Sequence, residues 1–171
     1  GARAGGGTPT PTPPLLALDI GASPGGWSSF LASRGADVLA VDPGSLNLSP
    51  QAHPFHSRIK HVPKRALDAE EELAKFGPVD YVVCDINIAP DLSAAMIVKV
   101  ADLGVLKPGA RLMLTLKMVQ RAKKGFPETR AKAIEILEAR FKVWKSYHLF
   151  SNSHREWTVL AIFNPPASSS S

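Results

Sequence analysis

Apolar residues along this chain fall into two alternating kinds of segment. Continuous apolar runs such as LLALDI (15–20) are typical of strands covered on both faces of a parallel sheet. Segments such as 127–141, where Ile134, Leu137 and Phe141 share one stripe, predict amphipathic helices. By these patterns we expect strands at 15–20, 36–42, 59–62, 79–86, 110–117, 142–150 and 157–163. We expect helices at 24–34, 68–76, 90–103 and 127–141.

The order of these segments predicts the fold class. Strands and helices alternate until the last two strands, which follow each other after a short connection. Alternation favours a parallel sheet built from strand–helix–strand units, and two consecutive strands favour an antiparallel pair. We therefore expect an α/β fold with a mostly parallel central sheet, helices on both faces and a C-terminal antiparallel strand pair. Ser23 can cap the first helix with Pro24 at its first position, and residues 107–109 predict a turn.

The two ends of the chain differ in composition from the body between them. Residues 1–14 (GARAGGGTPTPTPP) and 165–171 (PPASSSS) have no apolar periodicity. Such segments bury too little apolar surface to offset the entropy of ordering, so we expect a flexible N-terminal segment and a flexible tail. The folded domain is then expected over residues 15–164.

Charge and composition restrict the functional classes without choosing among them. The 171 residues carry a net charge of +5, which suits a polyanionic partner and equally suits a mildly basic protein without one. No apolar run approaches the roughly 20 residues that cross a bilayer. The single cysteine, Cys84, excludes an internal disulfide and suits a reducing compartment, so we expect a cytoplasmic or organellar location and no membrane partner. Cys84 lies inside an apolar strand, where we expect it to be packed.

The stretch LDIGASPGGWSSF (18–30) places a glycine-rich turn directly after the first strand. In open α/β sheets, ligands bind beyond the carboxyl ends of the strands. The spacing G-x-x-x-G-G differs from the dinucleotide motif G-x-G-x-x-G, and the turn lacks the lysine of a phosphate-binding loop. The carboxylate of Asp19 suits a cationic or hydroxyl-bearing ligand, and Asp42 ends the second strand, where an acid can accept hydrogen bonds from ribose hydroxyls. S-adenosylmethionine carries both a positive charge and ribose hydroxyls, so it suits both acids. For the glycine-rich turn taken alone, a plain strand-to-helix connection is an equally good explanation.

Four segments in order resemble the motifs of the FtsJ-like ribose 2′-O-methyltransferases. They are LDIGASPGGW (18–27), VVCDI (82–86), LKMVQRAKK (116–124) and HREWTV (154–159). Within that superfamily the chain is most similar to the catalytic domain of the RlmM-type enzymes, which methylate a cytidine ribose in ribosomal RNA. The resemblance implies a Rossmann-like class I methyltransferase fold. One departure from the usual pattern is that residues 1–18 contain no lysine upstream of the glycine motif. A second is that the RNA-binding portion that precedes the RlmM-type catalytic domain is not expected within these residues.

The resemblance also implies roles for individual residues. Asp85, Lys117 and Glu156 would form the catalytic set. The residues that would line the cofactor site are Asp19, Gly21, Ala22, Ser23, Pro24, Gly25, Gly26, Trp27, Asp42, Asp68 and Asp85. The tail segment NPP (164–166) is similar to a motif of amino-group methyltransferases, but Asp85 and Asn87 stand where that motif would act, which argues against methylation of a base.

The chemistry of these residue types agrees with transfer of a methyl group to a hydroxyl. Lys117 ends an apolar strand, and Asp85 and Glu156 stand at the ends of strands expected nearby. Lys117 could take the proton of a ribose hydroxyl or could position that hydroxyl, and the sequence leaves both roles open. Arg121, Lys123 and Lys124 follow and could bind RNA phosphates, although a solvated charged face explains them as well.

The sequence therefore predicts an S-adenosylmethionine-dependent RNA ribose 2′-O-methyltransferase, with ribosomal RNA as its partner. Two alternatives stay open: a methyltransferase of a small molecule or a protein, and a non-catalytic RNA-binding module that kept the fold. His53, His56 and His61 lack the further cysteine or acid partners of a metal site, so no metal is expected.

Overall fold

The computed structural model describes residues 13–49, 54–118, 125–148 and 156–165. In these residues the chain forms one seven-stranded sheet with the order β3-β2-β1-β4-β5-β7-β6. The strands are β1 (Leu16–Ile20), β2 (Asp37–Val41), β3 (Ile59–Val62), β4 (Val79–Cys84), β5 (Leu106–Lys117), β6 (Phe141–Tyr147) and β7 (Glu156–Phe163). The helices are α1 (Gly26–Ser33), α2 (Glu70–Phe76), α3 (Pro90–Asp102) and α4 (Phe126–Leu137), with short 3₁₀ turns η1 (His56–Arg58) and η2 (Ala66–Asp68).

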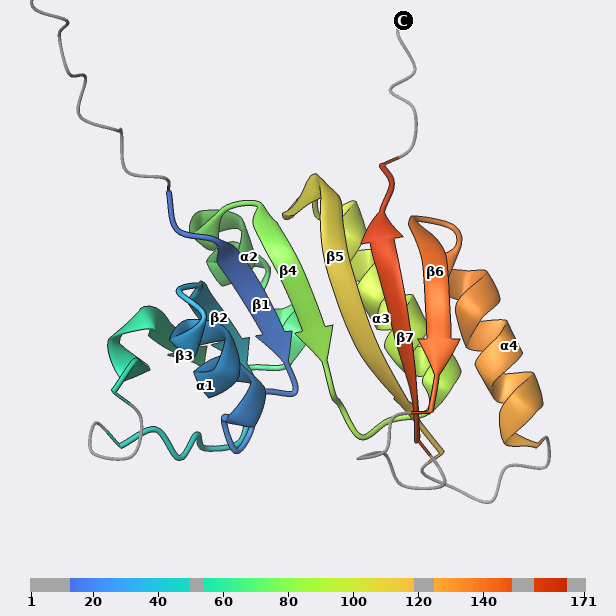
Figure 1. Ribbon diagram of the computed structural model, residues 1–171, viewed down its shortest axis with the longest axis horizontal. Coiled ribbons are helices and arrows are strands. Elements are labelled where there is room, and N and C mark those ends of the chain that lie inside the picture. The colour runs from blue at the N-terminus through green and yellow to red at the C-terminus, as the bar shows by residue number, and fades with distance from the viewer. Residues whose placement is uncertain (1–12, 50–53, 119–124, 149–155, 166–171) are drawn as a thin grey trace, which may run out of the picture.

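Strand direction confirms the expected α/β topology. β1 to β5 run parallel to their neighbours, and β7 pairs antiparallel with both β5 and β6. Helix α1 lies over one face near β1 and β2, whereas α2, α3 and α4 lie on the other face (Figure 1). The predicted helices on both faces and the C-terminal antiparallel pair are therefore present.

The core lies mainly between the sheet and α3 with α4. One row of register partners crosses β1, β4, β5 and β7, and each of its side chains is at most 2% exposed. The row consists of Leu18, Val82, Leu112 and Ala161. Leu39 lies beside Leu18 on β2 and is fully buried as well. Near-complete burial of this row explains why the strands read as continuous apolar runs.

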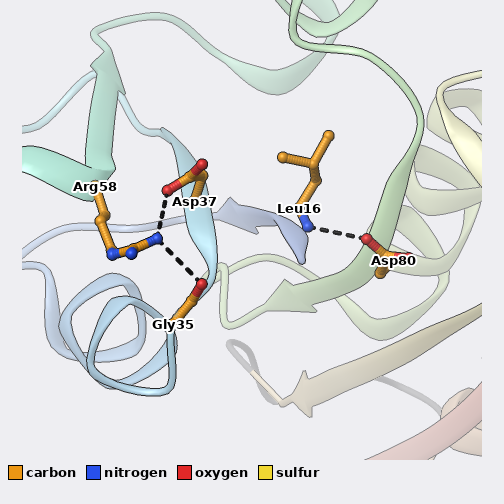
Figure 2. A network of polar contacts seen from close by, with 5 residues as sticks. All are labelled: Leu16, Gly35, Asp37, Arg58 and Asp80. Atoms are coloured by element: carbon orange, nitrogen blue, oxygen red, sulfur yellow. Dashed lines mark hydrogen bonds and ion pairs between the residues drawn. The ribbon is translucent and has the colours of Figure 1, made fainter. Parts of the chain in front are cut away.

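Polar contacts tie the amino ends of the strands together (Figure 2). The Arg58 guanidinium donates to the Asp37 carboxylate at 2.9 Å and to the Gly35 carbonyl at 3.2 Å, which fixes η1 beside the start of β2. The Asp80 carboxylate accepts from the Leu16 backbone N–H at 2.9 Å. The Lys107 ammonium donates to both Asp80 carboxylate oxygens at 2.8 Å. The acids Asp37 and Asp80 are thus structural.

The first helix begins later than the sequence predicts. It starts at Gly26, with Gly25 as the preceding residue at φ 117°, so Pro24 is not its first residue. Ser23 does not cap it either, because its hydroxyl donates to the Ser45 carbonyl at 2.9 Å. The prediction was wrong because the partner of Ser23 lies on a distant loop that sequence spacing does not reveal.

Two further boundaries differ from the prediction. α4 ends at Leu137, and Phe141 begins β6 instead of ending the helix. β5 begins at Leu106, which pairs with Val79, and the register with β4 then shifts, so that Tyr81 pairs with Arg111. The predicted turn at 107–109 is therefore an irregular bulge inside a longer strand.

Replacing Leu114 by alanine should destabilise the domain, because this side chain is fully buried in β5. Large-to-small changes in such cores cost about 2–5 kcal/mol of unfolding free energy. Leu15→Ala is the matched control: its side chain is 45% exposed and should cost less than about 1 kcal/mol. Urea denaturation followed by circular dichroism measures both, and equal losses would contradict this description of the core.

Candidate functional site

A cavity of about 690 Å³ lies at the carboxyl edge of the sheet. Its walls come from the ends of β1, β2 and β4, from residues 64–68, and from α3. β1 and β4 are neighbours, yet α1 follows β1 on one face and α3 follows β4 on the other. Such a switch point is where ligands bind in open α/β sheets, and the volume suits a cofactor-sized molecule.

Gly21 forms the floor of this cavity at the end of β1. Its φ of 77° lies in the left-handed region, and its N–H donates to the Val41 carbonyl at 3.0 Å. A Cβ at this position would lie 3.0 Å from the Ile86 Cα, closer than packed atoms allow. Glycine is therefore required where the chain turns between β1, β2 and the segment after β4.

The other turn residues mainly hold a loop that the sequence did not reveal. Residues 43–49 pack over the turn: the Asn47 N–H donates to the Pro24 carbonyl at 2.8 Å, and Ser23 binds the same loop. A Cβ on Gly25 would lie 2.9 Å from the Leu48 side chain, whereas Gly26 faces open space. Close packing of this loop explains Gly25 without any ligand.

Two more residues of the predicted turn also lie away from the cavity walls. Ala22 is buried. The Trp27 ring packs edge-on against Phe30, with 5.9 Å between ring centroids. Of the predicted turn residues, Gly21 is the one that lines the cavity. Cofactor contacts of the remaining turn residues stay predictions.

Asp19 lies beneath the turn and does not line the cavity. Its side chain is fully buried; Oδ2 accepts a 2.6 Å hydrogen bond from the Ser28 hydroxyl, and Oδ1 has no partner among the described groups. Burial raises the pKa of Asp19 to about 6, although the Ser28 hydrogen bonds act in the opposite direction. Repulsion by Asp85 and Asp42 raises this pKa further. The structure thus holds a buried carboxyl group with one free acceptor at the carboxyl edge of the sheet.

Asp42 and Asp68 both line the cavity, as the sequence predicted for cofactor-binding residues. Asp42 Oδ1 accepts from the Gly44 N–H at 2.6 Å and Oδ2 from the Ser23 N–H at 3.2 Å. Because each carboxylate oxygen has two lone pairs, both oxygens can still accept another hydrogen bond. Asp42 therefore supports the turn and keeps acceptor capacity toward the cavity.

Lys117, Asp85 and Glu156 come together beside this cavity. The Lys117 ammonium lies 3.0 Å from Asp85 Oδ1 and donates to the Asp85 carbonyl, also at 3.0 Å. Glu156 is the direct register partner of Lys117 across β5 and β7, so their side chains lie on the same face of the sheet. Asp85, which the sequence also predicted to line the cofactor site, is not among the residues that line the cavity, although the next residue, Ile86, is.

Some features of the site were missed by sequence reasoning. In the apolar wall of the cavity, Ile86 ends a predicted motif, but Leu92 and Met96 come from a face of α3 that carried no motif. The guanidinium carbon of Arg130 on α4 lies 4.0 Å from the centroid of the Trp157 ring. Trp157 directly follows Glu156 in the chain. These contacts join segments distant in sequence, and no local spacing signals them.

The remaining predicted residues can be placed briefly. Arg121, Lys123, Lys124 and His53 lie outside the described residues. Cys84 is buried as expected, and burial raises the pKa of its thiol to about 12. Within the described ranges no cluster of three metal-ligating side chains occurs. No helix in those ranges is long and apolar enough to span a membrane.

Comparison with known proteins places this geometry in a family. An uncharacterized protein of Methanocaldococcus jannaschii is 31% identical over 145 residues, covering 84% of this chain and 39% of the relative. Ribosomal RNA large subunit methyltransferase M of Laribacter hongkongensis is 34% identical over 128 residues, covering 75% of this chain and 33% of the relative. The chain therefore spans between a third and two fifths of these relatives.

Solved structures share the fold at low sequence identity. Fibrillarin of Methanococcus jannaschii superimposes with a TM-score of 0.72 at 21% identity, covering 90% of this chain and 68% of fibrillarin. Aeropyrum pernix fibrillarin, solved with bound S-adenosylmethionine, gives a TM-score of 0.65 at 16% identity, covering 86% and 66%. The FtsJ-like methyltransferase family matches residues 8–171. The chain therefore belongs to the FtsJ-like methyltransferase family.

Proposed function

We propose that this protein is an S-adenosylmethionine-dependent RNA ribose 2′-O-methyltransferase that acts on ribosomal RNA in the cytoplasm or an organelle. The observation that carries the proposal is the contact of Lys117 with Asp85, opposite Glu156 and beside the cavity at the switch point. An amine paired with one acid, with a second acid on the same face, beside a cofactor-sized cavity suits methyl transfer to a hydroxyl.

The residues of the cavity fit S-adenosylmethionine. Asp42 has free acceptor capacity for ribose hydroxyls, and Gly21 leaves the backbone accessible where a side chain would collide with Ile86. The apolar wall with Ile86 and Met96 suits a flat base, and Asp68 lies on the same cavity. The free Oδ1 of Asp19 adds a negative field beneath the turn, which suits a cofactor with positive charge. When bound, this cofactor supplies an electrophilic methyl group.

The Lys117 ammonium can donate one more hydrogen bond than those that Asp85 accepts. A charged amine has three N–H donors, and Asp85 takes two of them through its carboxylate and its carbonyl. The third can donate to a ribose hydroxyl oxygen and orient it. A neutral amine would instead keep a lone pair that accepts the hydroxyl proton. Both roles use the same fixed position, and Glu156 is the register partner of Lys117 on the same face of the sheet, where a carboxylate favours the charged amine.

RNA is the favoured substrate because relatives named as ribosomal RNA methyltransferases match 75% and 50% of the chain. The excess of cations, with a net charge of +5, suits a phosphate backbone. We extend the RNA-binding role to Arg121, Lys123 and Lys124, which follow Lys117 in the chain. Methylation of a small molecule or a protein, and RNA binding without catalysis, are the competing functions.

Transfer of labelled methyl groups from S-adenosylmethionine to total RNA tests the proposal. Ribonuclease-resistant, alkali-stable dinucleotides carrying the label are expected, because a 2′-O-methyl group blocks alkaline cleavage. Label in protein or in a small molecule would favour the first competing function, and label in an RNA base would contradict transfer to the ribose hydroxyl. Cofactor binding with no transfer to any RNA offered, including ribosomal RNA from cells lacking the protein, would favour RNA binding without catalysis.

Lys117→Ala should abolish methyl transfer and leave cofactor affinity near normal, because Lys117 lies outside the cavity lining. Positioned acid–base groups contribute roughly 10²–10⁴-fold to rate. Lys117→Arg should fail too, because the planar guanidinium has a different shape and stays charged. Single-turnover assays at saturating cofactor and RNA measure the effect.

Lys107→Ala is the matched control for this experiment. Lys107 stands at the other end of β5 and contacts Asp80 at 2.8 Å, just as Lys117 contacts Asp85. Its loss should leave the rate unchanged and cost at most about 1 kcal/mol of stability. A Lys117→Ala enzyme with the wild-type rate would remove Lys117 from the catalytic set.

Asp42→Ala should weaken binding of S-adenosylmethionine about tenfold to a hundredfold, since a charged hydrogen-bond acceptor contributes about 1.5–3 kcal/mol. Asp37→Ala is the control, because Asp37 begins the same strand and contacts Arg58 at the opposite edge. Calorimetric titration compares the two variants. Equal affinities in both would show that the acid at the end of β2 does not hold the cofactor.

Asp19→Asn should change how stability depends on pH. The pKa of Asp19 is about 6 in the folded protein and 3.8 as the reference value, so the folded state binds the proton more tightly. Its contribution to stability is therefore complete below pH 4 and is lost as pH rises through 6, by about 3 kcal/mol. Urea unfolding of both proteins from pH 4 to 7.5 isolates the contribution of Asp19 and its coupling to Asp85 and Asp42, because the other carboxylates cancel in the difference. We expect the stability advantage of the Asn variant to grow by that amount; a pH-independent difference would contradict the raised pKa.

A further inference from the structure

The two faces of the sheet are buried differently. On the face toward α1, one row of register partners runs from Ala40 and Asp19 through Val83, Met113 and Leu160 to Lys145. The next row runs from Val38 and Ala17 through Tyr81, Arg111 and Ile162 to Lys142. Residues of one row share a face, so these side chains form a continuous surface.

Burial along these rows falls steadily across the sheet. Ala17, Asp19, Val38 and Ala40 on β1 and β2 are fully buried, because α1 lies over them. Met113 and Leu160 are partly exposed, and Ile162 is 37% exposed. In Figure 1 no described helix lies in front of β5, β7 and β6, and α3 and α4 pack on the opposite side. Sheets of α/β domains are normally covered on both faces, but here no described helix covers this apolar patch.

The charges around this patch are cations. Arg111 and Lys142 flank Ile162, and Lys145 lies beside Leu160. None of the three forms an ion pair with an acid in the described part of the chain. The acids of the same face lie away from them, since Asp19 is buried beneath α1 and Glu156 stands beside Lys117. The patch therefore combines aliphatic side chains with cations that no described acid neutralises.

We infer that the face of β5, β7 and β6 formed by Met113, Leu160 and Ile162 with Arg111, Lys142 and Lys145 docks an amphipathic helix of a partner protein, with acidic residues beside its apolar stripe. Three strands at about 4.8 Å spacing are roughly 10 Å wide, which matches the diameter of one helix. Acids on the helix would pair with the three cations.

Two other occupants fit this face less well. RNA would satisfy the cations, but its phosphates would leave the aliphatic centre uncovered. Successive bases stack on aromatic rings in single-strand sites, and the centre of this patch is aliphatic. A second copy of the chain would bring Arg111, Lys142 and Lys145 against the same cations. Like charges facing each other across an interface are destabilising. An acidic helix satisfies both the charge and the aliphatic surface.

Methyl NMR of the whole chain labelled at methionine tests the inference at defined positions. Met113 lies in the patch, and Met96 lines the cofactor cavity, so each methyl group reports on one site. The probe is a designed helical peptide of 18 residues with leucines on one stripe and glutamates beside it. A second peptide keeps the leucines and replaces every glutamate by lysine.

We expect the glutamate peptide to shift the Met113 resonance and to leave Met96 unchanged, and the lysine peptide to bind at least tenfold more weakly. Lys142→Glu with Lys145→Glu should weaken the glutamate peptide at least tenfold. Lys60→Glu with Lys75→Glu is the control of equal charge change, on β3 and α2, and should leave affinity unchanged. Ile162→Glu provides a second variant aimed at the apolar centre.

Three results would overturn the inference. The first is that both peptides bind equally well, or that neither binds. The second is that a 12-nucleotide oligouridylate shifts the Met113 resonance at a lower concentration than the glutamate peptide does. The third is that the Met113 resonance shifts with protein concentration while sedimentation shows dimer formation. The second result would assign the face to RNA and the third to self-association. Failure of the proposed methyltransferase function would be seen separately, as absence of a Met96 response to S-adenosylmethionine and of methyl transfer.

Discussion

The parallel direction of β1, β2, β4 and β5 is the constraint on which the site depends. Parallel strands all end at the same edge, so residues far apart in sequence meet there without any local contact between them. Gly21, Asp42, Asp85 and Lys117 each follow or end a different strand, yet they lie around one cavity or directly beside it. The antiparallel strand β7 adds Glu156 to the same edge because it begins there, opposite Lys117.

The two edges of the sheet use the same residue types for different purposes. At the amino edge, Asp80 binds Lys107 and the start of β1, and this cluster holds three strands in register. At the carboxyl edge, Asp85 binds Lys117 through its side chain and its carbonyl, close to the cavity. Lys107 and Lys117 both lie on β5 and both pair with an aspartate, so residue type does not distinguish them. They differ in which end of the strand they occupy. The separation allows the domain to stabilise one edge and keep polar groups available at the other.

The buried side chain of Asp19 shows that placing a carboxyl group at the carboxyl edge of the sheet costs free energy. Its carboxyl is enclosed beneath the glycine turn with one oxygen unpartnered, and its raised pKa expresses the unfavourable free energy of charging it there. The same domain leaves part of one sheet face without a described helix, around Met113 and Leu160. Neither feature improves the stability of the isolated domain, so both are explained better by ligands and partners than by folding.

The sequence by itself determined the strands, the helices, the fold class and the family, because apolar periodicity and short ordered motifs are local properties of the chain. It also identified Asp85, Lys117 and Glu156 as a group, on the resemblance of the motifs. Tertiary structure decided what depends on contacts between distant segments. The loop over residues 43–49 takes Ser23 away from its expected capping role, and a register shift turns the expected turn at 107–109 into a bulge. The cavity wall and the uncovered sheet face likewise follow from strand order and from the side on which each helix packs, and neither is a property of any single stretch of sequence.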